Sequence, residues 1–497
     1  MVHHIWLVLP VVLPLLGALV CLPGEARWQQ RVASLVGFFT VLTSVALFVV
    51  VRTSGIVAVA VANWPAPFGI VLVSDLLSAL LLLVTSFLTW LTLVYSRHGV
   101  PAEQPRLGYF ALVLLLEAGV HGALLTGDLF NLYVWFEVLL MASFVLLTLG
   151  GTRGQLEGGL KYVTLNLLAS AFFLSGVGLL YGQAGSLNLA HLFLQSRDYS
   201  ATLPWLTGLA LLFLAFGVKA AVFPLFGWLP ASYHTPPVAI TALFSALLTK
   251  VGVYAMVRVG TLLLPEPPSW FSAVVLAIAA ATMITGVLGA VAQSEMKRLL
   301  SFHIVSQIGY LVMGFGLGSV AGLAGTIFFF VHVIVAKAAL FFATGVVERR
   351  LGSTHLLALG GHYARDPMLA TAAFVAAMAL AGLPPFSGFV AKLQLVSAGL
   401  SAEAYATVAA AVAVSLLTLF SMSKIWAEAF WKDPPAGYVP ERWEQPMPAC
   451  MRAPVFVLAG MNVLLGLFAA PLLGLAHESA MQLLDPDPYV RAVLPRR

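Results

Sequence analysis

The chain has 497 residues, of which 61% are hydrophobic and only 9% are charged, and its mean hydropathy is +0.98. Soluble domains contain about 25% charged residues, so this composition excludes a soluble protein and indicates an integral membrane protein. The formal net charge of +5 is spread over connecting segments and forms no basic patch with interleaved aromatic residues, which argues against nucleic-acid binding.

Apolar runs of about twenty residues, the length of a transmembrane helix, recur along the whole chain. A membrane β-barrel would instead show alternating segments of about ten residues. The sequence therefore predicts an all-α polytopic membrane protein with about fourteen transmembrane helices. In chain order the predicted spans are 4–22, 31–51, 73–96, 107–126, 127–149, 161–182, 203–229, 236–260, 271–292, 301–318, 322–347, 368–400, 404–430 and 454–476.

The first span looks like a signal peptide but lacks the basic residues that precede one, and Val20 stands where a cleavage site would need a small residue. We expect this span to be retained as a helix. The two cysteines, Cys21 and Cys450, lie far apart without a second cysteine or a histidine at ligand spacing. The sequence thus predicts neither a disulfide framework nor a metal or iron–sulfur site.

Basic residues lie mainly in the odd-numbered connections between the predicted spans, whereas the even-numbered connections hold little beyond Arg52, Arg197 and Arg258. The positive-inside rule places the odd-numbered connections in the cytoplasm, so both termini of a fourteen-span chain are predicted to lie outside it. The basic residues of the odd-numbered connections are Arg27, Arg31, Arg97, Arg106, Arg153, Lys161, Lys297, Arg298, Arg349, Arg350, Arg365, Lys432, Arg442 and Arg452.

Two predicted spans are too long for one straight helix and are interrupted by proline. The span 203–229 contains Pro224, and the span 368–400 contains Pro384 and Pro385. Interrupted helices in both halves of a transporter-length chain are typical of internal repeats that meet at the middle of the membrane. The alternative is that these prolines make ordinary kinks, which transmembrane helices tolerate.

Each of these prolines removes a backbone donor and clashes with the carbonyl four residues earlier. We therefore expect the carbonyls near Ala220, and those near Leu380 and Ala381, to lose their backbone partners. Unpaired carbonyls at this depth are tolerated only where they line a wet cavity.

Few charged residues lie deep inside the predicted spans, away from their ends. They are Glu117, Glu137, Lys219, Lys250, Lys337 and Lys392, with His121 and His332 among them. Each buried charge costs about 2.5–3.5 kcal/mol on insertion scales, so six unpaired charges would cost about 15–21 kcal/mol, comparable to or larger than the stability of a typical fold. We expect these groups to be paired or hydrated inside the bundle, where the default hypothesis is an ion or proton path.

Lys219 and Lys392 each belong to an interrupted helix, and Glu137 is a lone carboxylate in an apolar span. Burial disfavours the charged form of a lysine and a nearby carboxylate favours it by a similar amount, so such a lysine is expected to act as a titratable relay. A structural ion pair is the alternative. His332 and Lys337 are five residues apart, which permits a chain of contacts but no direct pair on one helix face.

Other buried polar residues have plausible structural roles. Lys250 continues a stripe of Thr241, Ser245 and Thr249 at a spacing of four, which a structural polar seam would also produce.

Glu117 and His121 share a helix face, where a locally satisfied pair and a functional pair are equally reasonable. His234 and His303 stand near predicted span ends, so we expect them to be solvated or to reach toward the membrane surface.

With these residues in view, the chain resembles the antiporter-like subunit family shared by Mrp-type Na+/H+ antiporters and respiratory complex I, with the D-type subunits of the Mrp antiporters as its nearest branch. The form SFHIVSQIGY and the presence of lysine at position 392 favour the Mrp branch. The segments that carry the resemblance span roughly residues 130–395 and are VWFEVLLMASF, VKAAVFPLFGWLPASYHTPPVAITALFSALLTKVGVYAMVR, SEMKRLLSFHIVSQIGYLVMGFG and LAGLPPFSGFVAKLQL.

The resemblance implies two inverted five-helix repeats, each with a broken helix. The implied units are helices 1–3 in residues 1–106, the first repeat in 107–260, the second repeat in 261–432, and a loop, helix 14 and tail in 433–497. It also implies a line of polar residues across the middle of the membrane. By this resemblance Glu137 would be the acidic modulator and Lys219 the paired proton-loading lysine. Lys250, His332 and Lys337 would form the bridge. Lys392 would be the exit or coupling lysine.

The function that the resemblance implies is proton translocation within a multi-subunit complex of the bacterial cytoplasmic membrane, which exchanges Na+ or another monovalent cation for H+. Its partners would be other antiporter subunits, and no redox cofactor is expected. One alternative is a proton-pumping membrane subunit of a redox complex, either an NADH:quinone oxidoreductase or a membrane-bound hydrogenase. Another is an inert scaffold, for which no buried charge would matter to ion flux.

Overall fold

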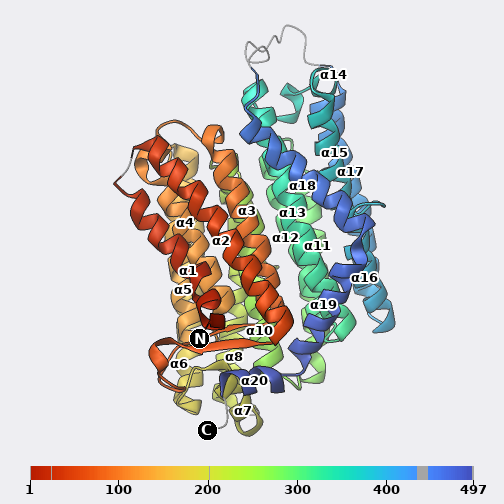
Figure 1. Ribbon diagram of the computed structural model, residues 1–497. Coiled ribbons are helices and arrows are strands. Elements are labelled where there is room, and N and C mark those ends of the chain that lie inside the picture. Colours follow the sequence, from red (N-terminus) through yellow and green to blue (C-terminus); the bar gives the residue numbers. More distant parts are fainter. Residues whose placement is uncertain (1, 24, 201, 434–445, 495–497) are drawn as a thin grey trace.

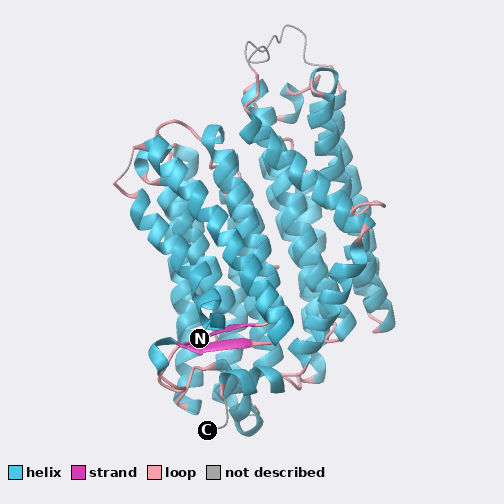
Figure 2. Cartoon of the chain, in the orientation of Figure 1, coloured by secondary structure: helices cyan, strands magenta, loops and turns pink. Residues whose placement is uncertain are grey.

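The computed structural model describes residues 2–23, 25–200, 202–433 and 446–494. Among these residues the fold is nearly all helical (Figures 1 and 2). Twelve described helices are long and apolar enough to cross a bilayer, and two shorter apolar helices bring the number of spans in this part of the chain to fourteen. The predicted fold class is therefore confirmed.

The spans are formed by fifteen of the described helices, because one span is made of two. They are α1 (Val2–Cys21), α2 (Ala26–Ser54), α3 (Leu76–Gly99), α4 (Tyr109–Leu125), α5 (Leu129–Thr148), α6 (Arg153–Ala184), α8 (Leu203–Ala220), α10 (Val238–Leu263), α11 (Ser269–Val291), α12 (Met296–Gly316), α13 (Val320–Leu351), α15 (Pro367–Ala381) with α16 (Ser387–Ser401), α17 (Tyr405–Trp426) and α18 (Ala449–Leu467).

Polar caps fix where several of these helices begin. Asp75 and Ser78 form a reciprocal capping box at α3, and Thr152 and Gln155 form another at α6. Ser319 accepts a backbone hydrogen bond at the start of α13. Each cap satisfies backbone donors that the first turn of a helix leaves unpaired.

Two five-span units, α4–α10 and α11–α17, follow each other, and the fourth span of each is interrupted. In the first unit α8 ends at Ala220 and the short helix α9 (Trp228–Ser232) follows a non-helical turn. In the second unit α15 ends at Ala381 and α16 begins at Ser387. Because five spans is an odd number, α11 crosses the membrane in the opposite direction to α4. Figure 1 shows the two units side by side.

The centre of the bundle is formed by α10 and α13, which pack against each other. Their apolar stretches are 100% buried, whereas that of α11 is only 33% buried. These two helices carry Lys250, His332 and Lys337, so the charged residues lie where the bilayer is farthest away.

The structure differs from the prediction at both ends of the chain. Residues near the predicted start of the third span form a β-hairpin of β1 (Val57–Ala60) and β2 (Val71–Ser74), and α3 begins only at Leu76. The predicted span 454–476 is wrong in its second half, because Phe468 leaves the helical conformation and α18 ends at Leu467. The residues on both sides of this turn are apolar, so hydropathy predicts one continuous span and does not reveal the turn.

Three helices that were not predicted as separate elements lie toward the lower end of the bundle in Figure 1. They are α7 (Leu189–Tyr199), α19 (Ala469–Leu484) and α20 (Asp487–Val493). Both chain ends also lie toward this end, as an even number of spans requires. Arg442, one of the basic residues used to predict orientation, lies outside the described residues.

Candidate functional site

The first pair of predicted site residues lies where α5, α6 and α8 meet. Glu137 on α5 accepts a hydrogen bond from Ser170 of α6. Lys219, one residue before the end of α8, is buried, and its Nζ lies 4.9 Å from the centroid of the Phe136 ring. The two charges are within electrostatic reach but form no direct ion pair in the described structure.

The helix that carries Lys250, α10, packs directly against the end of α8. A Cβ atom at Gly252 would lie 2.7 Å from the backbone nitrogen of Ala220, so only glycine allows this approach. The Lys250 ammonium donates to the Ser245 carbonyl and lies 3.4 Å from Thr249 Oγ1. The polar stripe that precedes it on α10 is fully buried.

Lys392 occupies the break in the second unit, as the predicted loss of backbone partners there requires. Its Nζ donates to the carbonyl oxygens of Leu380 (3.1 Å) and Ala381 (2.8 Å), and it lies 5.1 Å from the centroid of the Tyr310 ring. At the first break Trp228 Nε1 donates to the Val218 carbonyl at 3.0 Å. The Val218 carbonyl also accepts from Ala221 N, so in the described structure only at the second break does a side chain supply donors to the carbonyls that proline leaves unpaired.

His332 and Lys337 point to different neighbours on α13. Lys337 Nζ donates to the Leu300 carbonyl of α12 at 2.8 Å, whereas His332 Nδ1 lies 2.8 Å from Ser387 Oγ at the start of α16. Lys337 lies within electrostatic reach of Lys250, and His332 within electrostatic reach of Lys392. Glu137 is thus within electrostatic reach of Lys219, Lys250 of Lys337, and His332 of Lys392, whereas His332 and Lys337 bond to different helices, α16 and α12.

Glu117 and His121 do not bond to each other. His121 Nδ1 lies 2.8 Å from the carbonyl of Pro10, which Pro14 leaves without its usual donor four residues later in α1. His121 thereby closes a gap in a neighbouring helix. Both carboxylate oxygens of Glu117 are buried without a hydrogen-bond partner among the described residues.

The expected location of His303 near the membrane surface is wrong. His303 is fully buried inside α12, and its Nε2 lies 2.6 Å from Ser421 Oγ of α17. The span was predicted to begin at 301, but α12 begins at Met296, which places His303 deeper. His234 is partly buried in the connection before α10 and bonds to the Pro230 carbonyl at 2.8 Å.

The predicted location of Arg258 is also wrong. Arg258, assigned to a connection, lies within α10 and forms a buried ion pair with Asp75 at 2.7 Å. The guanidinium packs between the rings of Tyr254 and Tyr489, at 5.4 and 5.5 Å from their centroids. Asp75 lies 183 positions earlier, so no local pattern could have predicted this pair.

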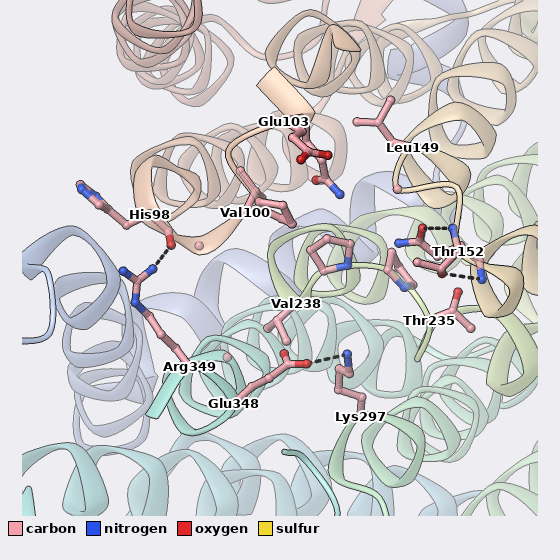
Figure 3. Close-up of a pocket in the computed structure, with 18 of the residues that line it drawn as sticks. His98, Val100, Glu103, Leu149, Thr152, Thr235, Val238, Lys297, Glu348 and Arg349 are labelled. Atoms are coloured by element: carbon pink, nitrogen blue, oxygen red, sulfur yellow. Dashed lines mark hydrogen bonds and ion pairs between the residues drawn. The ribbon is translucent and has the colours of Figure 1, made fainter. Parts of the chain in front are cut away.

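A polar cavity of about 570 Å³ opens at the end of the bundle where the basic connections gather (Figure 3). Its lining includes Glu103, Thr235 and Val238, together with the Lys297–Glu348 ion pair at 3.1 Å. Val238 is the first residue of α10, so the cavity adjoins the helix that carries the polar stripe and Lys250.

A fourteen-span bundle with two interrupted helices and a row of buried lysines is the architecture of an antiporter-like membrane subunit. Residues 126–418 match the family described as NADH:quinone oxidoreductase/Mrp antiporter, transmembrane region. A relative from Alkalihalophilus pseudofirmus, named as the D subunit of a Na(+)/H(+) antiporter, is 41% identical over 98% of this chain and 99% of its own length. The chain belongs to this family.

Two solved structures show the same fold. A chain of the Mrp complex from a Dietzia species superposes with a TM-score of 0.91 at 36% identity, covering 99% of each chain. A chain of the membrane-bound sulfane sulfur reductase, an archaeal respiratory membrane complex, superposes with a TM-score of 0.90 at 27% identity, covering 99% of this chain and 100% of that one. The fold is therefore shared by antiporter and respiratory complexes.

Proposed function

We propose that this chain is the proton-translocating D-type subunit of a multi-subunit Mrp antiporter, which exchanges Na+ or another monovalent cation for H+ across the bacterial cytoplasmic membrane. Support comes from family membership and from the full-length relative named as an antiporter subunit. Its partners are the other antiporter subunits. The chain is a transporter subunit rather than an enzyme.

The observation that best supports proton translocation is the set of atoms that the buried lysines contact. None of Lys219, Lys250, Lys337 and Lys392 forms an ion pair with a carboxylate in the described part of the chain. They contact backbone carbonyls, a hydroxyl and aromatic rings instead. A lysine without a counter-ion can lose its proton without breaking a buried salt bridge, which is what a relay needs.

We place the proton path from Glu137 and Lys219 in the first unit to Lys392 in the second. Glu137 adjusts the charge of Lys219, the proton passes to Lys250 across the packed end of α8, and Lys337 carries it into the second unit toward Lys392. The polar cavity beside α10 serves as the cytoplasmic mouth, and both chain termini lie on the outer side. Motion of the Glu137 charge or of a bridging water loads and unloads the lysines.

The test is ion flux in everted membrane vesicles that contain the complete antiporter complex, with and without this chain. We expect Na+-driven proton flux only in the complete complex, and no robust antiport from this chain alone. Flux that persists without the chain would contradict the proposal. Proton pumping that depends on an electron donor instead of Na+ would favour the redox-complex alternative, which the similarity to the sulfane sulfur reductase keeps open.

A further inference from the structure

The hydrogen bonds around His303 define its tautomer. The Ser421 hydroxyl donates to the Thr418 carbonyl at 3.0 Å, so its oxygen is the acceptor in the 2.6 Å contact with His303 Nε2. Nε2 therefore carries the proton, and Nδ1 presents a lone pair. Nδ1 is buried and has no hydrogen-bond partner among the described residues.

His332 is held in the same way at the second break. Ser387 donates to Asn462 Oδ1 at 3.0 Å, and the Asn462 amide is itself oriented by donating to the Leu458 carbonyl at 2.9 Å. The Ser387 oxygen is thus left to accept from His332 Nδ1. His332 Nε2 therefore presents a lone pair, and this atom is buried without a hydrogen-bond partner in the described structure.

The lysines on either side have donors to spare. A charged lysine has three N–H donors, of which Lys337 uses one, on Leu300, and Lys392 uses two, on Leu380 and Ala381. Both lysines also contact α12 on either side of His303: Lys337 binds the Leu300 carbonyl one turn before it, and Lys392 lies over the Tyr310 ring two turns after it. His303 is within electrostatic reach of both lysines.

Gln307, one turn after His303 on α12, has both amide atoms buried without a partner in the described residues. Buried polar groups are normally satisfied by protein or by ordered water, so this cluster of unsatisfied donors and acceptors favours a bridging water.

We propose that His303 is a further proton-carrying residue, which passes the proton between Lys337 and Lys392. The Lys337 ammonium gives its proton to His303 Nδ1, directly or through a water held by Gln307, and becomes a neutral amine. The imidazolium that forms then releases the Nδ1 proton to the neutral Lys392 amine. The Nε2–H bond to Ser421 is kept throughout, and no electrons are transferred. This inference rests on the proposed function.

The experiment replaces His303 by glutamine in the complete complex. The glutamine amide can still donate to Ser421 but cannot carry a proton, so we expect normal subunit levels and Na+-driven proton flux lowered about tenfold or more. The matched control is His477→Gln, an exposed histidine on α19, which should transport at the wild-type rate. Wild-type flux from an assembled His303→Gln complex would overturn the inference.

Two comparisons separate this inference from the proposed function. If Glu137→Gln and Lys219→Arg abolish flux while His303→Gln does not, only the inference fails. If all three transport normally, the proposed function fails.

Should His303→Gln not assemble, Ser421→Ala decides, because it keeps the histidine and removes the hydrogen bond that fixes its tautomer. Reduced flux with a shifted pH profile would support the relay, and an unchanged rate and profile would refute it.

Discussion

At the scale of single residues, the buried cations fall into two kinds. Arg258 forms a buried ion pair with Asp75 at 2.7 Å, and its charge is permanent because a guanidinium does not deprotonate in proteins. The four buried lysines make no such pair in the described structure, so loss of a proton would break no ion pair. We attribute structure to the first kind and proton movement to the second.

Replacing Glu137 by glutamine should remove most transport while the complex still assembles. Glutamine has the same size and can keep the Ser170 contact, but it removes the charge that acts on Lys219. Coupling between two such sites is typically worth about 5- to 150-fold, so we expect a flux loss within that range.

The measurement for Glu137→Gln is the response of a pH-sensitive dye to Na+ in everted vesicles from an antiporter-deficient host. Glu478→Gln is the control, because its ion pair with Arg52 is exposed and should contribute little. Near-normal flux in an assembled Glu137→Gln complex would show that this charge is dispensable.

At the scale of elements, the interrupted helices are where the structure departs most from a simple bundle. Proline frees the carbonyls at the end of α15, and Lys392 on α16 returns to bind two of them. A single side chain therefore both stabilises the break and stands on the proposed path. Its two roles can be separated by substitution.

Lys392→Leu should destabilise the complex as well as stop transport. Leucine leaves two buried carbonyls without donors, at about 1–3 kcal/mol for each. Lys392→Gln retains a donor and should assemble better, yet still fail to transport because an amide cannot carry a proton. Thermal stability of the detergent-solubilised complex, measured beside flux, checks this. Equal stability of the two variants would mean that the carbonyl contacts do not matter.

The sequence predicted the elements well and the contacts poorly. Apolar runs and prolines reveal the fourteen spans and both breaks, because hydropathy and the missing proline donor are local properties. The hairpin β1–β2 and the turn at Phe468 were not predicted, because short strands and turns in apolar segments leave hydropathy unchanged.

For the candidate site, buried charge alone singles out the residues, whose role stays a prediction, but it does not predict their contacts. Lys392 binding to Leu380, and the burial of His303 against Ser421, depend on packing between helices that are distant in sequence. The form SFHIVSQ contained the one available signal for His303, a histidine and a glutamine spaced one turn apart.

At the scale of the whole molecule, both ends of the chain lie toward one end of the bundle and the basic connections gather at the other (Figure 1). The polar cavity lies at the basic end. If that end faces the cytoplasm, the cavity is in contact with the compartment from which the cation is exported.

Native Cys450 tests this orientation. It lies partly exposed at the start of α18, at the basic end, with its Sγ 3.1 Å from His98 Nδ1, whereas Cys21 is buried. A membrane-impermeant maleimide should label Cys450 in everted vesicles and not in right-side-out vesicles. Cys450→Ser should abolish the signal. Labelling from the outer side alone would reverse the proposed topology.

The central claim, that protons pass through this chain by way of lysines that lose and regain them, is tested most directly by Lys219→Arg. Arginine keeps the positive charge beside Glu137 and over the Phe136 ring, but a guanidinium does not deprotonate in proteins. We predict normal levels of the complex and no Na+-driven proton flux in everted vesicles. Wild-type flux from a verified Lys219→Arg complex would contradict the account and leave Lys219 as a structural cation.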